Sequence, residues 1–518
     1  MSGATTDGFA GVRAQRSLAR ARSANQEQPR SRFDARIEEG SAMELMTSPA
    51  GVERPSNQEP TPRGPARRHR AHRADHVDIH LEAPHQPRRV ALARAVVRLL
   101  SATIGEDSGL RIELVDDGAG VPVMGEPPRA TVRLRGPDAV ARILWPPTPD
   151  SIAEAYLRGD VDIDGDMLAA LEAAQMIDLR RLGIGGARRL ARWVFELQRD
   201  TPPAPRLVRS AHLTGVRHSP ARDMAAIRFH YDVGEDFYRL WLDRRLTYSC
   251  AYFERADDPA ADLDAAQEAK LDLICRKLGL RAGQRLLDIG CGWGSLIVYA
   301  AERHGVEAIG VTLSERQANE ANRRAAEAGL GGRVRAEVRD YRDLGELGDF
   351  DAVASVGMFE HVGRANLVTY FQAAYGAVRP GGRFLNHGIA QARPSRQFGP
   401  GLVPGGTQFG ARYVFPDGEL VPVEVSSLIA REAAGFELLD VQLLRPHYAL
   451  TLSAWVARLE AHWDEAVATA GTEVARTWRL YMSAAQHGFA KGELEVAQLL
   501  LARPEVDGPA PRPLRPWW

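Results

Sequence analysis

Hydrophobic and polar positions divide the chain into one long segment without periodicity and two segments with regular patterns. Residues 1–75 show little apolar periodicity, whereas helical and strand patterns begin near residue 89. The elements expected next are a helix, two strands and a second helix, over residues 90–104, 110–115, 130–134 and 147–157. Short mixed elements of this kind predict a small α+β domain over residues 89–182.

A second, longer segment alternates apolar strands with amphipathic helices. The strands are expected over residues 285–289, 307–312, 334–338, 352–356 and 383–389, and the main helices over residues 295–303, 315–328 and 366–378. This alternation predicts the α/β class with a doubly wound, mostly parallel sheet, whose ligand lies at the carboxyl ends of the strands. Apolar residues at helical spacing between 450 and 467 are expected to belong to the core. We assign this second domain to residues 221–504.

Composition describes the segments that remain. Residues 183–220 are rich in Arg and contain a Pro-Pro-Ala-Pro break, so they are expected to be a linker, and residues 505–518 are expected to be a Pro-rich tail that frays. Residues 1–75 combine Arg, Ser, Pro and Gln, which is typical of a disordered tail. That tail either has no role beyond solubility or adsorbs weakly to acidic lipid headgroups. The Glu38-Glu39 pair argues against an organellar transit peptide.

Charge and cysteine content exclude several classes of protein. The formal net charge of −1 over 518 residues provides no overall field for binding nucleic acid. Three cysteines are too few for a disulfide framework and lack metal-binding spacing, which fits a reducing cytosol and no metal. Acidic residues alternate over 160–166 but lack the closing Glu of a calcium loop, so a turn and strand are expected there. Because no apolar run approaches the ~20 residues needed to span a bilayer, a cytoplasmic or peripheral membrane protein is expected.

The strongest chemical signal is the run Leu-Leu-Asp-Ile-Gly-Cys-Gly-Trp-Gly at residues 286–294. Three glycines directly after an apolar strand allow a tight turn in which main-chain N–H groups approach a ligand. The spacing G-x-G-x-G lacks the last glycine of the dinucleotide fingerprint. The turn therefore favours S-adenosylmethionine over a nicotinamide or flavin dinucleotide.

Four further motifs surround this turn in a fixed order. They are His-Tyr-Asp-Val-Gly at 230–234, Thr-Tyr-Ser-Cys-Ala-Tyr-Phe at 247–253, Gly-Met-Phe-Glu-His-Val-Gly at 357–363 and Asn-His-Gly-Ile at 386–389. Together they resemble the cyclopropane-fatty-acyl-phospholipid synthases and the related mycolic-acid cyclopropane synthases, over about residues 222–502. Residues 89–182 resemble, more weakly, the amino-terminal domain of the phospholipid-acting synthases.

The resemblance implies a Rossmann-like S-adenosylmethionine methyltransferase domain and a set of cofactor-binding residues. Those residues are Tyr248, Ser249, Asp288, Gly290, Gly292, Trp293, Gly294, Thr312, Gln317, Asp340 and Tyr341. In most Rossmann-type methyltransferases an acidic residue ends the second strand and binds the ribose, whereas the resemblance implies that Thr312 and Gln317 act here as neutral partners. Asp340 would accept a hydrogen bond from the adenine amine, and Tyr341 would pack on its ring.

The resemblance also implies the reaction, which is methyl transfer to a carbon–carbon double bond through a carbocation. The base would be a bound bicarbonate held by residues matching Cys250, Glu360, His387, Ile389 and Tyr448. The aromatic residues expected to stabilise the cation are Tyr231, Tyr252, Phe253, Phe359 and Tyr448. Taken singly, each residue also has a purely structural interpretation: Glu360 as a helix cap and Cys250 as a small buried core residue.

The substrate implied is an unsaturated phospholipid in a membrane, met by a peripheral protein at the cytoplasmic face. Two product outcomes stay open, a cyclopropane chain and a methylene- or methyl-branched chain, because the position of proton loss decides between them. A silent lipid- or cofactor-binding module and a nitrogen or oxygen methyltransferase are the more distant alternatives. Glu235 and the Gly- and Pro-rich stretch at 391–408 depart from the phospholipid-acting pattern, which leaves acyl and headgroup preference open. A homodimer is the assembly that the family often forms.

Deletion of residues 1–75 is expected to leave activity on detergent-dispersed lipid nearly unchanged, because a segment of this composition contributes no core. A methyl-transfer assay that compares the shortened and full-length chains checks this expectation. A severe loss of activity would contradict a tail that is merely solvated.

Overall fold

The computed structural model describes residues 86–104, 109–115, 120–122, 128–175, 177, 179–231, 233–392 and 409–518. The tail predicted at 1–75, and residues 393–408 of the stretch that departs from the family pattern, lie outside the described residues.

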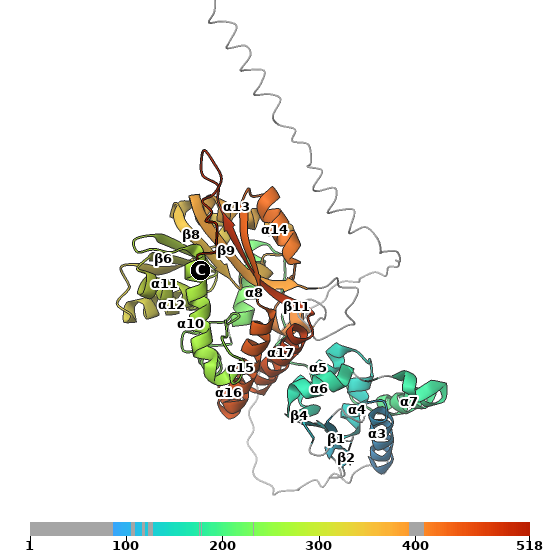
Figure 1. The fold of residues 1–518 in the computed structure, drawn as a ribbon. Coiled ribbons are helices and arrows are strands. Elements are labelled where there is room, and N and C mark those ends of the chain that lie inside the picture. Colours follow the sequence, from blue (N-terminus) through green and yellow to red (C-terminus); the bar gives the residue numbers. More distant parts are fainter. Residues whose placement is uncertain are drawn as a thin grey trace, which may run out of the picture. The chain divides into compact units, whose positions relative to one another are not determined.

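A four-stranded sheet with its helices forms the first folded part of the chain (Figure 1). Its elements are α3 (Gln86–Ser101), β1 (Leu110–Leu114), β2 (Gly120–Pro122), β3 (Ala130–Leu134), α4 (Gly136–Leu144), α5 (Pro149–Arg158), β4 (Val161–Gly165) and α6 (Met167–Gln175). The strand order is β2-β1-β3-β4, with β1 and β3 parallel and the other pairs antiparallel. Val96, Leu114 and Val140 meet in its core. This is the α+β architecture expected for the segment. The acidic residues at 160–166 lie in a turn and strand β4, as expected.

The segment assigned to a linker begins with regular structure. Residues 183–220 start with helix α7 (Gly183–Arg199), which follows the short turn η3 (Leu179–Leu182) and packs on α3 and α4. Val194 and Leu197 of α7 are buried there, because their spacing places them on one face of the helix. The expectation of a linker throughout 183–220 is therefore wrong, because the many arginines of this segment mask the apolar spacing of α7.

A seven-stranded sheet forms the second folded part. Its strands are β5 (Arg285–Ile289), β6 (Glu307–Thr312), β7 (Val334–Val338), β8 (Phe350–Val356), β9 (Val378–Gln391), β10 (Glu437–Leu443) and β11 (Leu494–Ala502). Their order is β10-β11-β9-β8-β5-β6-β7, and the five strands from β9 to β7 pair in parallel. The two last strands, β10 and β11, pair antiparallel with their neighbours. The predicted α/β class and mostly parallel sheet are therefore confirmed.

Helices and short turns connect and cover this sheet. The helices are α8 (Pro220–Tyr231), α9 (Glu235–Arg239), α10 (Pro259–Leu278), α11 (Ser295–His304), α12 (Glu315–Glu327), α13 (Leu367–Ala377), α14 (Val423–Glu432), α15 (Arg445–Ala461), α16 (Trp463–Ala470) and α17 (Thr472–Ala490). The short turns are η4 (Tyr341–Leu347), η5 (Phe359–His361), η6 (Arg364–Asn366) and η8 (Gly410–Val414). Among the described helices, none combines the length and apolar character needed to cross a membrane.

Local sequence signals explain why α10 has these bounds. The Asp258 side chain accepts a hydrogen bond from the Ala261 N–H, and Pro259 occupies the first turn, where its missing N–H costs nothing. Gly279 ends the helix in the left-handed conformation, with φ of 67°. Between these two signals the helix packs against α11, α15 and β9.

An aromatic core lies beside the ends of the central strands. Trp241 lies at its centre and packs against Tyr238, Trp455 and Trp478, with ring centroids 5.3–5.4 Å apart. The apolar face predicted between residues 450 and 467 contributes to the same core. Helices α15 and α17, which lie side by side (Figure 1), carry two of these tryptophans.

The C-terminal segment does not fray as expected. Trp517 Nε1 donates a hydrogen bond to the Arg276 carbonyl at 2.8 Å, and the Arg383 guanidinium lies over its ring at 4.1 Å. Lys277 lies over the ring of Trp518 at 5.6 Å. Arg383 of β9 and Lys277 of α10 therefore provide cationic contacts for the two tryptophans, which composition alone did not reveal.

Helix α17 also joins the two sheets. Arg476 is 8% exposed and donates hydrogen bonds to the carbonyls of Tyr156 and Val161 and to Asp162. Arg479, one turn further along, donates to the carbonyls of Ile163 and Gly165. Two arginines from the C-terminal part of the chain thus donate hydrogen bonds to main-chain carbonyls of α5 and β4.

Arg476→Ala is expected to lower the free energy of unfolding by about 2–4 kcal/mol, because it removes three hydrogen bonds of a buried guanidinium, including its ion pair with Asp162. Chemical denaturation measures the change. Arg431→Ala is the matched control: its side chain is 53% exposed and lies 3.7 Å from Glu432, so its loss should cost under about 0.5 kcal/mol. Equal effects of the two substitutions would contradict the assignment.

Candidate active site

The glycine turn connects β5 to α11 at the carboxyl edge of the sheet. Gly290 and Gly294 both adopt left-handed conformations, with φ of 83° and 82°. The N–H groups of Gly290 and Cys291 donate to the Val311 carbonyl at 2.8 and 3.0 Å, which ties the turn to β6. A Cβ atom at Gly290 would lie 2.6 Å from Cβ of Met358. Glycine is required at this position for both conformation and space.

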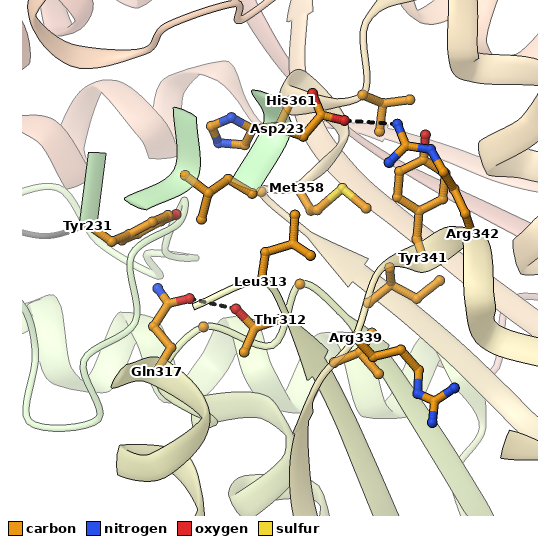
Figure 2. Close-up of a pocket in the computed structure, with 17 residues that line it drawn as sticks. Asp223, Tyr231, Thr312, Leu313, Gln317, Arg339, Tyr341, Arg342, Met358 and His361 are labelled. Atoms are coloured by element: carbon orange, nitrogen blue, oxygen red, sulfur yellow. Dashed lines mark hydrogen bonds and ion pairs between the residues drawn. The ribbon is translucent and has the colours of Figure 1, made fainter. Parts of the chain in front are cut away.

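A cavity opens beside this turn, and we call it the glycine-turn cavity (Figure 2). Among the residues that line it are Gly290, Gly292, Thr312, Gln317 and Tyr341, all predicted to bind the cofactor. The Thr312 hydroxyl donates to Oε1 of Gln317 at 2.8 Å, as the dashed line in Figure 2 shows. Within the described residues, Nε2 of Gln317 is buried without a hydrogen-bond partner. The pair therefore presents an unsatisfied donor to a ligand hydroxyl.

The hollow continues around the turn toward α10. Its lining includes Gly290, Gly292 and Gln317 again, together with four more of the predicted residues, Tyr248, Ser249, Asp288 and Trp293. Oδ1 of Asp288 is also buried without a partner among the described residues. Nine of the eleven predicted cofactor residues thus line two adjoining hollows that share Gly290, Gly292 and Gln317.

The other two predicted residues, Gly294 and Asp340, have structural contacts instead. Gly294 begins α11 where that helix approaches Ala321. The Asp340 carboxylate accepts hydrogen bonds from the Arg342 main chain at 2.9 Å and from its guanidinium at 2.7 Å. Arg342 is held further by an ion pair with Asp223 at 2.8 Å and lies over the Tyr341 ring at 4.5 Å. The adenine contact implied for Asp340 therefore stays a prediction.

Arg342 and Asp223 were not expected from the sequence. Figure 2 shows their ion pair at the side of the cavity opposite Gln317, beside Tyr341. The two residues lie 119 positions apart in the chain, and neither belongs to a recognisable motif. Only the fold brings α8 next to η4.

Lys270 is a second unexpected residue of this site. It is fully buried in α10, lines the hollow with Asp288, and its Nζ donates to Oγ of Ser249 at 2.5 Å. Burial lowers the pKa of Lys270 to about 8, and burial raises the pKa of Asp288 to about 7, an effect that the Lys270 charge partly offsets. A lysine side chain on a helix normally faces solvent, so the sequence pattern did not predict that Lys270 is buried in this site.

A second cavity, of about 180 Å³, adjoins the first, and we call it the Glu360 cavity. All six residues predicted to be catalytic line it: Tyr231, Cys250, Glu360, His387, Ile389 and Tyr448. They come from α8, the 247–253 segment, η5, β9 and α15. Tyr231 and Gly357 line both cavities, so the two spaces meet at these residues.

Glu360 is the acidic centre of the second cavity. The Ile389 N–H donates to its Oε1 at 2.6 Å, while its Oε2 is buried without a partner among the described residues. Burial raises the pKa of Glu360 to about 7, against the lowering effect of the Ile389 hydrogen bond. The Ile389 N–H, which the resemblance assigned to a bound anion, is therefore occupied by Glu360 in this structure.

His387 presents a neutral donor to the same cavity. The Gln498 amide, on the paired residue of β11, donates to Nδ1 of His387 at 3.1 Å. This contact assigns the ring proton to Nε2. Burial lowers the pKa of His387 well below its ordinary value, so the ring carries no charge at neutral pH.

Cys250 behaves as a buried thiol. It is 0% exposed, and its Sγ donates to the Ala251 carbonyl at 3.3 Å. Burial also raises the pKa of Cys250 strongly, so the neutral thiol dominates and a thiolate nucleophile is disfavoured.

The aromatic lining differs in part from the expectation. Tyr231 and Tyr448 line the Glu360 cavity, whereas Tyr252 stacks on His447 with centroids 4.5 Å apart and Phe359 packs near Tyr370. Phe253 likewise belongs to the neighbouring core. Three other aromatic residues complete the lining, namely Tyr248, Phe415 and Tyr481. Phe415 and Tyr481 lie outside the recognised motifs, so only the packing of α17 and the segment after η8 reveals them.

Comparison with known proteins agrees with this geometry. The family model described as mycolic acid cyclopropane synthetase matches residues 218–499. A probable fatty acid methyltransferase of Pseudomonas putida is 38% identical over 386 residues, which cover 74% of this chain and 90% of that protein. The cyclopropane-fatty-acyl-phospholipid synthase of Escherichia coli K12 is 32% identical over 398 residues, 75% of this chain and 92% of that protein. The structure of the cyclopropane synthase MmaA2 from Mycobacterium tuberculosis has a TM-score of 0.50 and 34% identity, and covers 54% of this chain and 98% of that one.

The parallel sheet, the glycine turn and these relatives define an S-adenosylmethionine-dependent methyltransferase. The chain belongs to the mycolic acid cyclopropane synthetase family. The resemblance noted from the four sequence motifs is therefore confirmed.

The raised pKa of Glu360 predicts a pH-dependent difference in stability between the protein and its Glu360→Gln variant. A carboxyl group whose pKa rises from 4.5 to about 7 on folding stabilises the folded state fully below about pH 4.5 and loses that contribution as the pH passes 7. Glu360→Gln removes this dependence, so the variant should gain about 3 kcal/mol relative to the parent between about pH 4 and pH 8. Urea denaturation across that range measures the difference. Glu424→Gln, at an exposed position, should follow the parent, and parallel profiles for all three proteins would contradict the buried carboxyl.

Proposed function

We propose that this enzyme transfers a one-carbon group from S-adenosylmethionine to the cis double bond of an unsaturated phospholipid acyl chain and forms a cyclopropane ring. The observation that carries the proposal is the meeting of the two cavities at Tyr231 and Gly357. One cavity has the glycine turn, and the other has a buried carboxylate, a neutral imidazole and aromatic walls. A methyl donor and an alkene can therefore face each other across a shared boundary.

The residues present fit a nucleoside cofactor in the first cavity. Gln317 Nε2 and Asp288 Oδ1 are buried polar atoms without protein partners among the described residues, and both line the hollow around the glycine turn. A ribose hydroxyl could satisfy the Gln317 donor, and the buried Lys270 charge favours a carboxylate nearby. When bound, S-adenosylmethionine supplies an electrophilic methyl group, which the alkene π electrons attack as the carbon–sulfur bond breaks.

The aromatic lining suits the cation that this attack creates on the acyl chain. Tyr231 and Tyr448 line the Glu360 cavity together with the buried Glu360 side chain. Aromatic faces and a nearby anion stabilise a carbocation, and exclusion of water prevents its capture. No nucleophilic side chain is needed, which agrees with the neutral thiol of Cys250.

The cation must then lose a proton, and we propose that bicarbonate binds in the Glu360 cavity to accept it. Glu360 Oε2 is a free acceptor for the bicarbonate hydroxyl, while His387 Nε2–H and the Tyr448 hydroxyl are donors for its oxygens. Bound there, bicarbonate would supply an oxygen base for the proton that the transferred methyl group must lose when the ring closes. Cys250 and Ile389 contribute main-chain atoms to the same walls.

The extent of the alignments supports a phospholipid substrate over a mycolic acid. The E. coli phospholipid synthase aligns over 398 residues of this chain, well beyond the region that the family model matches. The cyclopropane mycolic acid synthase 1 of M. tuberculosis aligns over 279 residues, 53% of this chain, although 95% of that protein is covered. The longer alignment supports a phospholipid substrate for this chain.

A branched product is the second candidate. The P. putida relative is named as a fatty acid methyltransferase, and loss of the proton from a neighbouring carbon would give a methylene-branched chain of the same mass. Proton NMR of the recovered lipid distinguishes cyclopropyl from vinylidene hydrogens. The decisive experiment incubates the protein with S-adenosylmethionine and vesicles that contain cis-unsaturated phospholipid, and identifies the product in this way.

Glu360→Gln is expected to abolish turnover on unsaturated phospholipid while it leaves the affinity for S-adenosylmethionine nearly unchanged, because Glu360 lines the second cavity and not the glycine turn. A lipid methylation assay measures the first effect and isothermal titration the second. Glu424→Gln, at an exposed position of α14, is the control and should retain both properties. Full activity of Glu360→Gln would refute the anion site.

A further inference from the structure

One face of helix α7 exposes large apolar side chains to solvent. Ile184 is 75% exposed and Phe195 is 67% exposed. Their separation of 11 residues corresponds to about three turns, so both lie on the same face of the helix. Two exposed apolar side chains on one helix face are unusual for a surface that meets only water.

Arginines border these apolar side chains. Arg188 lies four residues after Ile184, Arg192 lies four residues after Arg188, and both are exposed. In the part of the chain that the structure describes, neither has an ion-pair partner. The helix has no acidic residue in its first turn, and its Glu196 pairs with Arg88 at 2.6 Å. The exposed face is therefore both apolar and strongly basic.

The opposite face holds α7 in place. Val194 and Leu197 are buried against the first sheet's helices, and Arg89 of α3 donates to the Leu197 carbonyl at 3.2 Å. Arg189 lies over the Trp193 ring at 5.9 Å. Figure 1 shows α7 beside α3 at the edge of this part of the protein. The basic, apolar face thus belongs to a folded helix that is already anchored.

We propose that this face of α7 docks on an anionic phospholipid bilayer. Ile184 and Phe195 would enter the boundary between headgroups and acyl chains, while Arg188 and Arg192 would contact the acidic headgroups. A second copy of the chain is disfavoured as the occupant, because two such faces would bring unpaired arginines together. Nucleic acid would match the arginines but leave both apolar side chains in water. The inference rests on the proposed function, whose substrate lies in a bilayer.

The test measures sedimentation of the full-length protein with phosphatidylcholine vesicles that contain or lack phosphatidylglycerol, without S-adenosylmethionine. The parent is expected to bind the anionic vesicles and to bind neutral vesicles weakly. Each Arg near an anionic surface contributes about fivefold to partitioning, so Arg188→Gln with Arg192→Gln should reduce binding about 25-fold. Ile184→Ser with Phe195→Ser should reduce it at least about tenfold.

The matched control replaces exposed apolar residues elsewhere. Val506 is 81% exposed and Leu514 is fully exposed, so Val506→Ser with Leu514→Ser should bind as the parent does. Circular dichroism verifies that all variants fold, and turnover on detergent-dispersed lipid should be unchanged in the α7 variants. Binding is measured without the cofactor, so a protein that failed to methylate lipid could still bind vesicles. Failure of the proposed function is therefore distinguishable from failure of the membrane-docking proposal. Three results would overturn the proposal. The α7 variants could bind vesicles as well as the parent does, or the control could lose as much binding as they do. The protein could also bind duplex DNA in preference to anionic vesicles.

Discussion

The hydrogen bond from the Ile389 N–H to Glu360 is the contact on which the site depends. It joins the turn after β8 to strand β9 at 2.6 Å and holds a carboxylate in a fully buried position. One oxygen of Glu360 is satisfied by the protein, and the other is left for a ligand. Without this contact, burial of the carboxylate in the wall of the Glu360 cavity would be far more costly.

Parallel pairing of the central strands explains why the two cavities meet. The chain after β5 forms the glycine turn, the chain after β8 carries Gly357 and Glu360, and β9 carries His387 and Ile389. These strands are neighbours, so their carboxyl-terminal segments lie along one edge of the sheet. Tyr231, from α8, then closes the space between them. The glycine-turn cavity and the Glu360 cavity therefore adjoin along this edge.

Segments far from the recognised motifs complete the second cavity. Tyr448 and Tyr481 come from α15 and α17, and η8 contributes Gly410. Helix α5 of the first sheet supports η8, because Glu154 accepts hydrogen bonds from Arg412 and from the Tyr413 hydroxyl at 3.0 Å. Arg476 and Arg479 of α17 tie the same region to α5 and β4. The small α+β part is therefore connected by direct contacts to the wall of the Glu360 cavity.

Local sequence patterns were enough to predict the strands around the glycine turn and the residue types of the candidate site. Strands β5, β6 and β7 have the predicted bounds, because short apolar runs between glycines and helices carry an unambiguous local signal. The tertiary structure alone decided the burial of Lys270, the pairing of Asp340 with Arg342, and the use of the Ile389 N–H by Glu360. Each of these depends on residues distant in the chain, and a side chain's charge and hydrogen-bond partners follow from packing that no local pattern records.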